Sequence, residues 1–539
     1  MSSPTAETRE ILSRALDNRP DEGIVRVNRE IFTDEELFEL EMKYIFEGNW
    51  IFLAHESQVE NPGDYFTTNM GRQPVVITRS RDGKLNCLIN SCSHRGAMLC
   101  RKKVDNRTTL TCPFHGWTFS NDGSLLKAKD EATGGYPENF NTDGSHDLRR
   151  VPKFESYRGF LFGSLNDDVV PLEEFLGDTR VVLDMLIDQS PDGLEVLKGT
   201  STYTYDGNWK LQAENGADGY HVSSVHWNYA ATTSRRGTGE SENETTAMDA
   251  GSWGEQGGGY FSYPYGHLML WQEWGNPEDR PVYDRLEELK ELHGEERGKF
   301  MVNASRNLCL YPNVYIMDQF STQIRRLEPV SVDKTEVSIW CIAPKGESAE
   351  NRANRIRQYE DFFNATGMAT PDDLEEFRSS QKTYQASSFP WNDMTRGLTQ
   401  QVEGLNDVAR ALGMNEVLSS GSRTEDEGLY PIQHGYWEEV MEKAVEAEDA
   451  DYQARTSKQV RNEEQSAEVT AEFAKAKAAA KAATASSSSS SEGTGGRRRR
   501  RRRQYSPTPQ TPEEFRYVRY HPRRNLRFHL QREPAARRP

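Results

Sequence analysis

The chain lacks several features that mark membrane, secreted and repeat proteins. None of its 539 residues belongs to an apolar run of 18 or more, so no membrane-spanning helix is expected. Residues 1–7 contain neither a basic nor a hydrophobic segment, which argues against a signal peptide. The six cysteines are too few and too scattered for a disulfide framework. We therefore expect a cytoplasmic protein, since a reducing compartment keeps thiols free.

What the chain does have is a short pattern of mixed cysteines and histidines. Cys92 and His94 are followed, after seventeen residues, by Cys112 and His115. Each arm offers one thiolate and one imidazole, which is the ligand set of a Rieske-type [2Fe–2S] cluster, with two Cys on one iron and two His on the other. A tetrahedral zinc ion is the alternative, but zinc sites usually pair Cys with Cys and His with His.

A second group of potential metal ligands follows about a hundred residues later. His221 and His226 could supply the two imidazoles of a facial triad, which binds non-haem Fe(II) through two His and one carboxylate. On an ideal helix these residues would point about 140° apart. They can share a metal only if the helix breaks between them or if the site lies at its end.

Asp218 precedes His221 by three residues, which places both side chains on one face of a helix. A carboxylate in this position commonly fixes the orientation of a metal-binding imidazole. The alternative interpretation is an acidic residue on an exposed helix surface.

With these motifs, the chain resembles the α (large) subunits of Rieske non-haem iron ring-hydroxylating dioxygenases, and within that family it is most similar to the benzoate 1,2-dioxygenase group. The similarity extends from about residue 20 to about residue 445. Beyond the two motifs, it rests on the following segments: Gly116–Ser120, Ser156–Phe160, Asp188–Pro191, Glu214–Trp227 and Ala369–Phe377.

The resemblance implies a role for each matching residue. Cys92, His94, Cys112 and His115 correspond to the cluster ligands, and His221 and His226 to the iron-binding histidines. The third iron ligand is assigned to Asp393, in the segment 391–397, with Asp407 as the alternative.

The resemblance places two further residues of this chain near the iron. Asp218 is expected to bridge His221 to a cluster histidine of a neighbouring subunit, either His115 or His94. Asn215 resembles an asparagine near the iron, although many relatives have it one position earlier, where this chain has Glu214.

The expected fold is α+β, with a small β-rich Rieske domain and a larger catalytic domain whose antiparallel sheet is flanked by helices. We predict an N-terminal helical segment over 1–45, the Rieske domain over 46–160 and the catalytic domain over 161–450. Residues 33–36 resemble a helix-capping box, and residues 81–84 a hairpin turn.

The resemblance also implies the reaction and the partners. The chain would add both atoms of O₂ to benzoate, giving the 1,2-cis-dihydrodiol carboxylate, with a [2Fe–2S] cluster and mononuclear Fe(II) as cofactors. Anthranilate and substituted benzoates such as toluate or halobenzoate are the alternative substrates. No G-x-G-x-x-G motif follows a predicted strand, so NADH would be oxidised by a separate flavin and iron–sulfur reductase. The implied assembly is an α₃β₃ hexamer with a small β subunit.

Residues 455–539 differ in composition from the rest of the chain. They contain an Ala/Lys-rich stretch, a serine run and seven consecutive arginines over 497–503, whereas the whole chain has a net charge of −18. Such a low-complexity segment is predicted to be disordered. An arginine run also binds nucleic acid without sequence preference, which is the alternative function from a different class. A bare Rieske electron carrier is the other alternative, and it would lack the second group of ligands.

Overall fold

The computed structural model describes residues 3–236 and 256–487. The chain divides into two compact units, residues 1–459 and residues 460–539. The first unit contains both the predicted Rieske region and the predicted catalytic region. Within the described residues, no helix combines the length and apolar character needed to cross a membrane.

The N-terminal segment combines helices with a small sheet. Asp34, rather than Thr33, caps α2, because its side chain accepts the N–H of Leu37 at 2.7 Å. A wider π-helical turn then continues the helix to Phe46. The elements of this segment are α1 (Ala6–Leu12), β1 (Leu16–Arg19), β2 (Ile24–Asn28) and α2 (Glu35–Glu41), and β2 also pairs with β21 (Trp391–Asp393).

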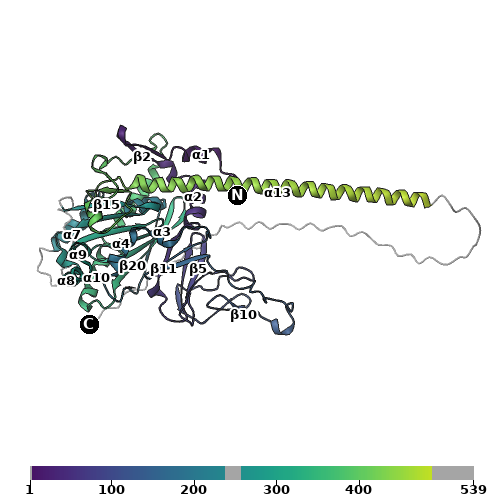
Figure 1. Ribbon diagram of the computed structural model, residues 1–539, viewed down its shortest axis with the longest axis horizontal. Coiled ribbons are helices and arrows are strands. Elements are labelled where there is room, and N and C mark those ends of the chain that lie inside the picture. Colours follow the sequence, from purple (N-terminus) through teal and green to yellow (C-terminus); the bar gives the residue numbers. More distant parts are fainter. Residues whose placement is uncertain (1–2, 237–255, 488–539) are drawn as a thin grey trace, which may run out of the picture. The chain divides into compact units, whose positions relative to one another are not determined.

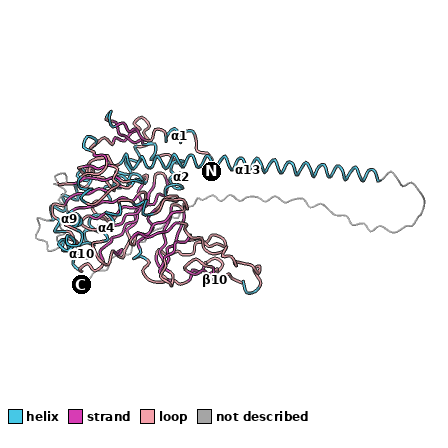
Figure 2. The backbone as a smooth tube through the Cα atoms, viewed as in Figure 1, coloured by secondary structure: helices cyan, strands magenta, loops and turns pink. Residues whose placement is uncertain are grey.

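The Rieske region is made almost entirely of strands and loops, as Figure 2 shows. It forms three small antiparallel sheets with strand orders β6-β5-β4-β7, β10-β9-β8 and β11-β12-β3. The predicted hairpin turn over 81–84 joins β5 to β6, and Gly83 adopts the positive φ of 82° that the turn requires. The strands are β3 (Ile51–His55), β4 (Asp64–Met70), β5 (Gln73–Arg79), β6 (Leu85–Ile89), β7 (Val104–Asn106), β8 (Thr109–Thr111), β9 (Thr118–Ser120), β10 (Leu125–Lys127), β11 (Lys153–Tyr157) and β12 (Phe160–Ser164).

The catalytic region is built on a ten-stranded antiparallel sheet, which the strands labelled β15 and β20 in Figure 1 help to locate. Its order is β13-β20-β19-β18-β17-β16-β15-β23-β22, with β14 also paired to β20. The strands are β13 (Leu194–Val196), β14 (Ser201–Tyr205), β15 (Gly258–Ser262), β16 (Leu268–Glu273), β17 (Ala304–Leu310), β18 (Val314–Asp318), β19 (Thr322–Ser331), β20 (Lys334–Pro344), β22 (Val402–Glu403) and β23 (Ser419–Gly421).

The two faces of this sheet belong to different hydrophobic cores, because side chains alternate along each strand. Met317 and Ile339 lie in a core with the N-terminal segment and the helices that carry the second ligand group. Ile316 and Trp340, one residue away, lie in a core with Phe66 and other Rieske-region residues. The helices are α3 (Leu172–Leu176), α4 (Thr179–Ile187), α5 (Trp209–Asn215), α6 (Val222–Val225), α7 (Trp227–Arg236), α8 (Leu286–His293), α9 (Glu295–Asn303), α10 (Ala349–Phe362), α11 (Thr370–Thr383) and α12 (Asp407–Ala411).

The first part of the segment after residue 455, which the sequence predicts to be disordered, is helical in the structure. Helix α13 (Tyr430–Ser487) continues through this segment, and its described side chains between 455 and 477 are exposed. Ala, Lys and Glu are frequent in the stretch, and these residues favour helix even without packing. The arginine run over 497–503 lies outside the described residues.

A buried charged network connects helices α2, α5 and α13. Glu41 is fully buried and accepts hydrogen bonds from the indole N–H groups of Trp209 and Trp437, both at 2.7 Å. It also forms an ion pair with the buried ammonium of Lys210. The network fixes α5, which leads directly into the second group of ligands.

Glu41→Gln is expected to lower the free energy of unfolding by about 3–5 kcal/mol, because it leaves the Lys210 charge buried without its counter-ion. Urea unfolding followed by tryptophan fluorescence measures this change. Glu39→Gln, at an exposed position on the same helix, should change stability by less than about 1 kcal/mol. Equal stability of the two variants would show that the buried pair contributes nothing to the fold.

Candidate metal centres and active site

The four predicted cluster ligands lie on two loops with the same backbone design. In each loop the cysteine N–H donates to the carbonyl five residues later, at 2.9 Å for Cys92 and 2.7 Å for Cys112. The N–H of Gly96 or Gly116, four residues after its cysteine, donates back to the cysteine carbonyl. Both glycines have positive φ, 73° and 74°, which only glycine adopts readily. The two arms of the motif are therefore structurally equivalent.

The loops place thiols inward and imidazoles outward. Cys92 and Cys112 are 3% and 2% exposed, and their thiols lie side by side. His94 is exposed and His115 is half-buried, with their ring centroids 4.7 Å apart. The indole of Trp117 stacks on His94 at 4.7 Å and holds that ring in place.

The spacing of these donors fits two metal atoms better than one. Ligands of a tetrahedral zinc ion lie within about 4 Å of one another, given Zn–N and Zn–S bonds of about 2.0–2.3 Å. Within the described part of the chain, the triad discussed below is the only group of three or more potential ligands whose donor atoms all lie within 4.8 Å. A cluster with Cys on an inner iron and His on an outer iron accounts for both the spacing and the burial.

The second ligand group is organised by a helix of a single turn. Helix α6 comprises only Val222–Val225, with His221 as its N-cap and His226 as its C-cap. The backbone leaves helical geometry at His226 before α7 begins. Of the two conditions stated from the sequence, a break between the histidines or a site at the helix end, the structure meets the second: the histidines flank the two ends of α6, and both rings point to one place.

The carboxylate that meets these histidines is Asp373. Its Oδ1 lies 3.4 Å from Nε2 of His221 and 3.4 Å from Nε2 of His226. The two Nε2 atoms are 3.3 Å apart. Asp373 is 7% exposed and lies in the first turns of α11, on the same buried helix face as Phe377 and Gln381. Two imidazoles and one carboxylate thus converge as in a facial triad.

The assignment of Asp393 as the third ligand is wrong. Asp393 ends strand β21, is exposed, and accepts hydrogen bonds from Thr395 instead. The strand pairs with β2, and Asp393 does not belong to the group of donor atoms formed with the histidines. The alternative, Asp407, is fully exposed and pairs with Arg410.

Asp218 contacts His221 as predicted, although the local structure differs. Residues 216–220 form a turn rather than a helix. The carboxylate of Asp218 accepts the N–H of Tyr220 at 2.6 Å, and its Oδ2 lies 3.0 Å from Nδ1 of His221. Burial raises the pKa of Asp218, but the contacts with His221 and the backbone outweigh it and hold that pKa below its usual value. Asp218 therefore stays ionised and orients the His221 ring.

Asn215 lies inside the ligand group. Its Nδ2 is 3.2 Å from Nε2 of His221 and 3.3 Å from Oδ1 of Asp373. Glu214, at the position where many relatives have the asparagine, instead contacts His434 at 2.7 Å. The asparagine near the metal site is thus Asn215.

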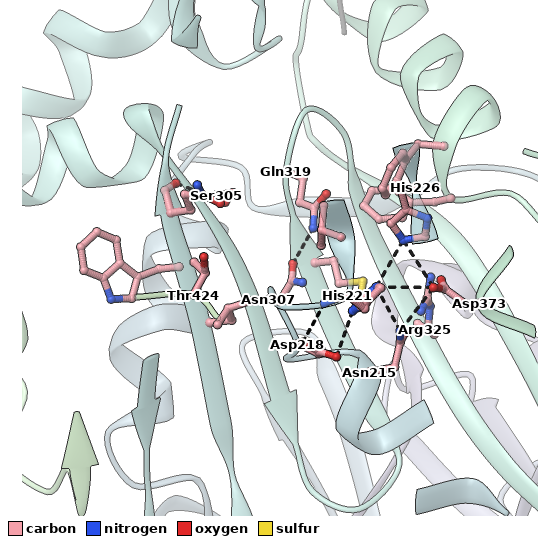
Figure 3. Close-up of a pocket in the computed structure, with 17 residues that line it drawn as sticks. Asn215, Asp218, His221, His226, Ser305, Asn307, Gln319, Arg325, Asp373 and Thr424 are labelled. Carbon is pink, nitrogen blue, oxygen red and sulfur yellow. Dashed lines mark hydrogen bonds and ion pairs between the residues drawn. The ribbon is translucent and has the colours of Figure 1, made fainter. Parts of the chain in front are cut away.

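A pocket opens beside these ligands. Figure 3 shows His221, His226 and Asp373 directed toward one another at one side, with Arg325 next to them and Ser305 and Thr424 opposite. Its walls combine apolar and polar side chains, among them Leu270, Met317, Phe362, Phe363, Asn307 and Gln319. The pocket therefore offers apolar surface for a ring and polar groups beside the ligand group.

One acidic residue near the site is protonated at neutral pH. Burial, together with the negative charges of Asp218, Glu214 and Asp393, raises the pKa of Glu427 to about 8. Because the folded state holds this proton more tightly than the unfolded state, stability falls as the pH rises from about 4.5 to about 8.

We therefore expect Glu427→Gln to melt about 2–4 °C higher than the wild type at pH 9, after correction for any difference at pH 6. Thermal melts at both pH values provide the measurement. If the melting temperatures of the two proteins changed equally between pH 6 and pH 9, Glu427 would already be ionised at pH 7.

Comparison with known proteins agrees with this arrangement. Residues 49–153 match the Rieske [2Fe-2S] domain, and residues 194–407 match the catalytic domain of ring hydroxylating alpha subunits. The chain therefore belongs to the α subunits of Rieske-type ring-hydroxylating dioxygenases. It is an oxidoreductase that uses a Rieske [2Fe–2S] cluster and a mononuclear non-haem iron.

The most similar relatives include two dioxygenases named for benzoate derivatives. The chain is 58% identical to toluate 1,2-dioxygenase subunit alpha from Pseudomonas putida, covering 79% of this chain and 93% of the relative. It is 57% identical to the 2-halobenzoate 1,2-dioxygenase large subunit from Burkholderia cepacia, covering 83% and 96%. Naphthalene 1,2-dioxygenase from Rhodococcus sp. shares the fold, with a TM-score of 0.68 at 24% identity over 81% of this chain and 98% of the other.

Proposed function

We propose that this chain is the terminal oxygenase large subunit of a cytoplasmic benzoate 1,2-dioxygenase. It would convert benzoate, O₂, NADH and one proton into the 1,2-cis-dihydrodiol carboxylate and NAD⁺. The observation that carries the proposal is the convergence of His221, His226 and Asp373 beside a pocket. Relatives named for toluate, 2-halobenzoate and anthranilate support a benzoate-type substrate.

In this proposal, His221, His226 and Asp373 hold the iron, and Cys92, Cys112, His94 and His115 hold the cluster. When bound, the iron would provide open positions for oxygen next to the ring, and the cluster would deliver electrons singly. Asp218 keeps His221 in one tautomer and leaves Nε2 free for the metal. The pocket walls exclude water and hold the ring beside the triad.

The remaining assignments concern partners. A separate NADH-dependent flavin and iron–sulfur reductase supplies electrons, and a small β subunit completes an α₃β₃ hexamer. The exposed His94 and the half-buried His115 are the cluster groups available to a neighbouring subunit. Asp218 would link His221 to one of them across that interface.

Product analysis tests the proposed reaction. The purified oxygenase, its matched reductase, NADH and O₂ are incubated separately with benzoate, m-toluate, 2-chlorobenzoate and anthranilate, and products are identified by mass spectrometry. We expect benzoate to give the cis-dihydrodiol carboxylate with the highest kcat/KM. A higher kcat/KM for anthranilate, with catechol as product, would show that anthranilate and not benzoate is the preferred substrate.

A further inference from the structure

Arg325 is buried in the pocket but is not used by the ligand group. It belongs to β19, is 4% exposed, and lines the pocket together with His221, His226 and Asp373. Figure 3 shows its side chain beside the triad.

The guanidinium of Arg325 lacks the partners that other buried arginines have. Its buried Nε has no hydrogen-bond partner among the described residues, and no described carboxylate forms an ion pair with it. By contrast, the other buried arginines of this region each contact a carboxylate: Arg280 and Arg306 contact Asp318, Arg326 contacts Glu328, and Arg355 contacts Glu347. Arg325 is therefore the exception among them.

Arg325 and the adjacent Arg326 differ in their partners because their side chains lie on opposite faces of the sheet. Arg326 points to the opposite face of β19, where it contacts Thr68 and Glu328. Arg325 points to the face that carries Met317 and the pocket. A buried, unpaired cation is costly unless an anion joins it.

The rest of the pocket suits an aromatic anion. Leu270, Met317, Phe362 and Phe363 offer apolar surface for a ring. A guanidinium binds a carboxylate through two parallel N–H···O bonds, which fixes both the position and the plane of the carboxylate. A planar ligand with an apolar ring and one negative charge would contact the apolar side chains through its ring and the guanidinium of Arg325 through its carboxylate.

We propose that Arg325 binds the carboxylate of the substrate and thereby determines which ring carbons face the triad. This inference rests on the proposed function, because it assumes a substrate of the aromatic carboxylate class. It extends that function by assigning specificity to one side chain. Uncharged arenes of the same size would bind without this contact and therefore weakly.

The test measures equilibrium binding to the purified holoenzyme by titration calorimetry, with benzoate and its uncharged analogue benzamide as probes. Arg325→Gln is expected to weaken benzoate binding at least about 30-fold, as expected when one partner of a buried charge pair is removed. Benzamide affinity should change by less than about threefold. Arg378→Gln, an exposed arginine on α11 paired with Glu375, is the matched control for loss of one positive charge.

Thermal melting separates ligand recognition from a structural role. Without ligand, Arg325→Gln should melt at or above the wild-type temperature, since it removes an unpaired buried charge. Benzoate should raise the melting temperature of the wild type and of Arg378→Gln but not of Arg325→Gln. Arg325→Lys, which keeps the charge but loses the two-pronged geometry, should recover part of the affinity.

Three outcomes would overturn the inference. Unchanged benzoate affinity in Arg325→Gln, with a wild type that binds and converts benzoate, would refute the role of Arg325 and leave the proposed function intact. A lower melting temperature of ligand-free Arg325→Gln would show that the guanidinium is stabilised within the protein. A wild type that binds none of the aromatic carboxylates would refute the proposed function and this inference together.

Discussion

Asp373→Ala is expected to reduce benzoate turnover at least about 100-fold and to release the mononuclear iron. Replacing a residue that only hydrogen-bonds to a metal ligand typically lowers metal affinity or activity about 10–100-fold. Loss of a ligand itself should therefore have a larger effect. The cluster should remain, because its ligands are on separate loops. Metal analysis together with the EPR spectrum of the reduced cluster measures both sites in one sample.

Asp393→Ala and Asp407→Ala are the matched controls, since both carboxylates are exposed and neither belongs to the ligand group. Each should keep iron and turnover within about twofold, as expected for surface substitutions. If Asp393→Ala lost iron while Asp373→Ala retained it, the geometry of the triad would be contradicted.

Asp218→Asn is expected to keep both metals and yet slow electron delivery by about 10–100-fold. A neutral amide of the same shape cannot hold the Nδ1 proton of His221 with the strength of a carboxylate. In a single-turnover experiment, the cluster is reduced, benzoate and O₂ are added, and reoxidation is followed by absorbance.

The exposed Glu376→Gln serves as the control for loss of one negative charge, and it should reoxidise at the wild-type rate. Normal reoxidation of Asp218→Asn would show that this carboxylate only supports the local turn. Loss of iron from Asp218→Asn would show that it acts through metal affinity instead of electron transfer.

The sequence predicted the parts of the site that depend on local geometry. The Cys/His arms, the convergence of His221 and His226 at the ends of a short helix, and the contact from Asp218 all follow from spacing over a few residues. The small β-rich region and the antiparallel sheet with flanking helices were likewise predicted.

The third ligand was missed because it depends on long-range packing. Asp393 matched a segment by resemblance, but strand pairing with β2 controls where that segment runs. A signal for Asp373 was present in the sequence: it shares an i, i+4, i+8 helix face with Phe377 and Gln381, after a helix start at Thr370 and Pro371. An acidic residue on a buried helix face needs a positive partner, which a metal ion provides.

Arg325 could not be singled out in the same way. Arg325 and Arg326 are adjacent in one strand, and only the register of the sheet decides which of them faces the pocket. The helical extension beyond residue 455 was missed for a different reason, since low-complexity composition was weighted above the helix propensity of Ala, Lys and Glu.

The one-turn helix α6 and the first turns of α11 are far apart in the sequence, yet their side chains meet at a single point. In the proposed holoenzyme, this makes the ligand set a reversible cross-link between two distant chain segments. Closing such a long loop removes conformational freedom from the unfolded chain, as a disulfide does. Iron supply would then control how long the enzyme survives in the cell as well as how fast it works, because chelation would open the link and expose α6 and α11 to proteolysis.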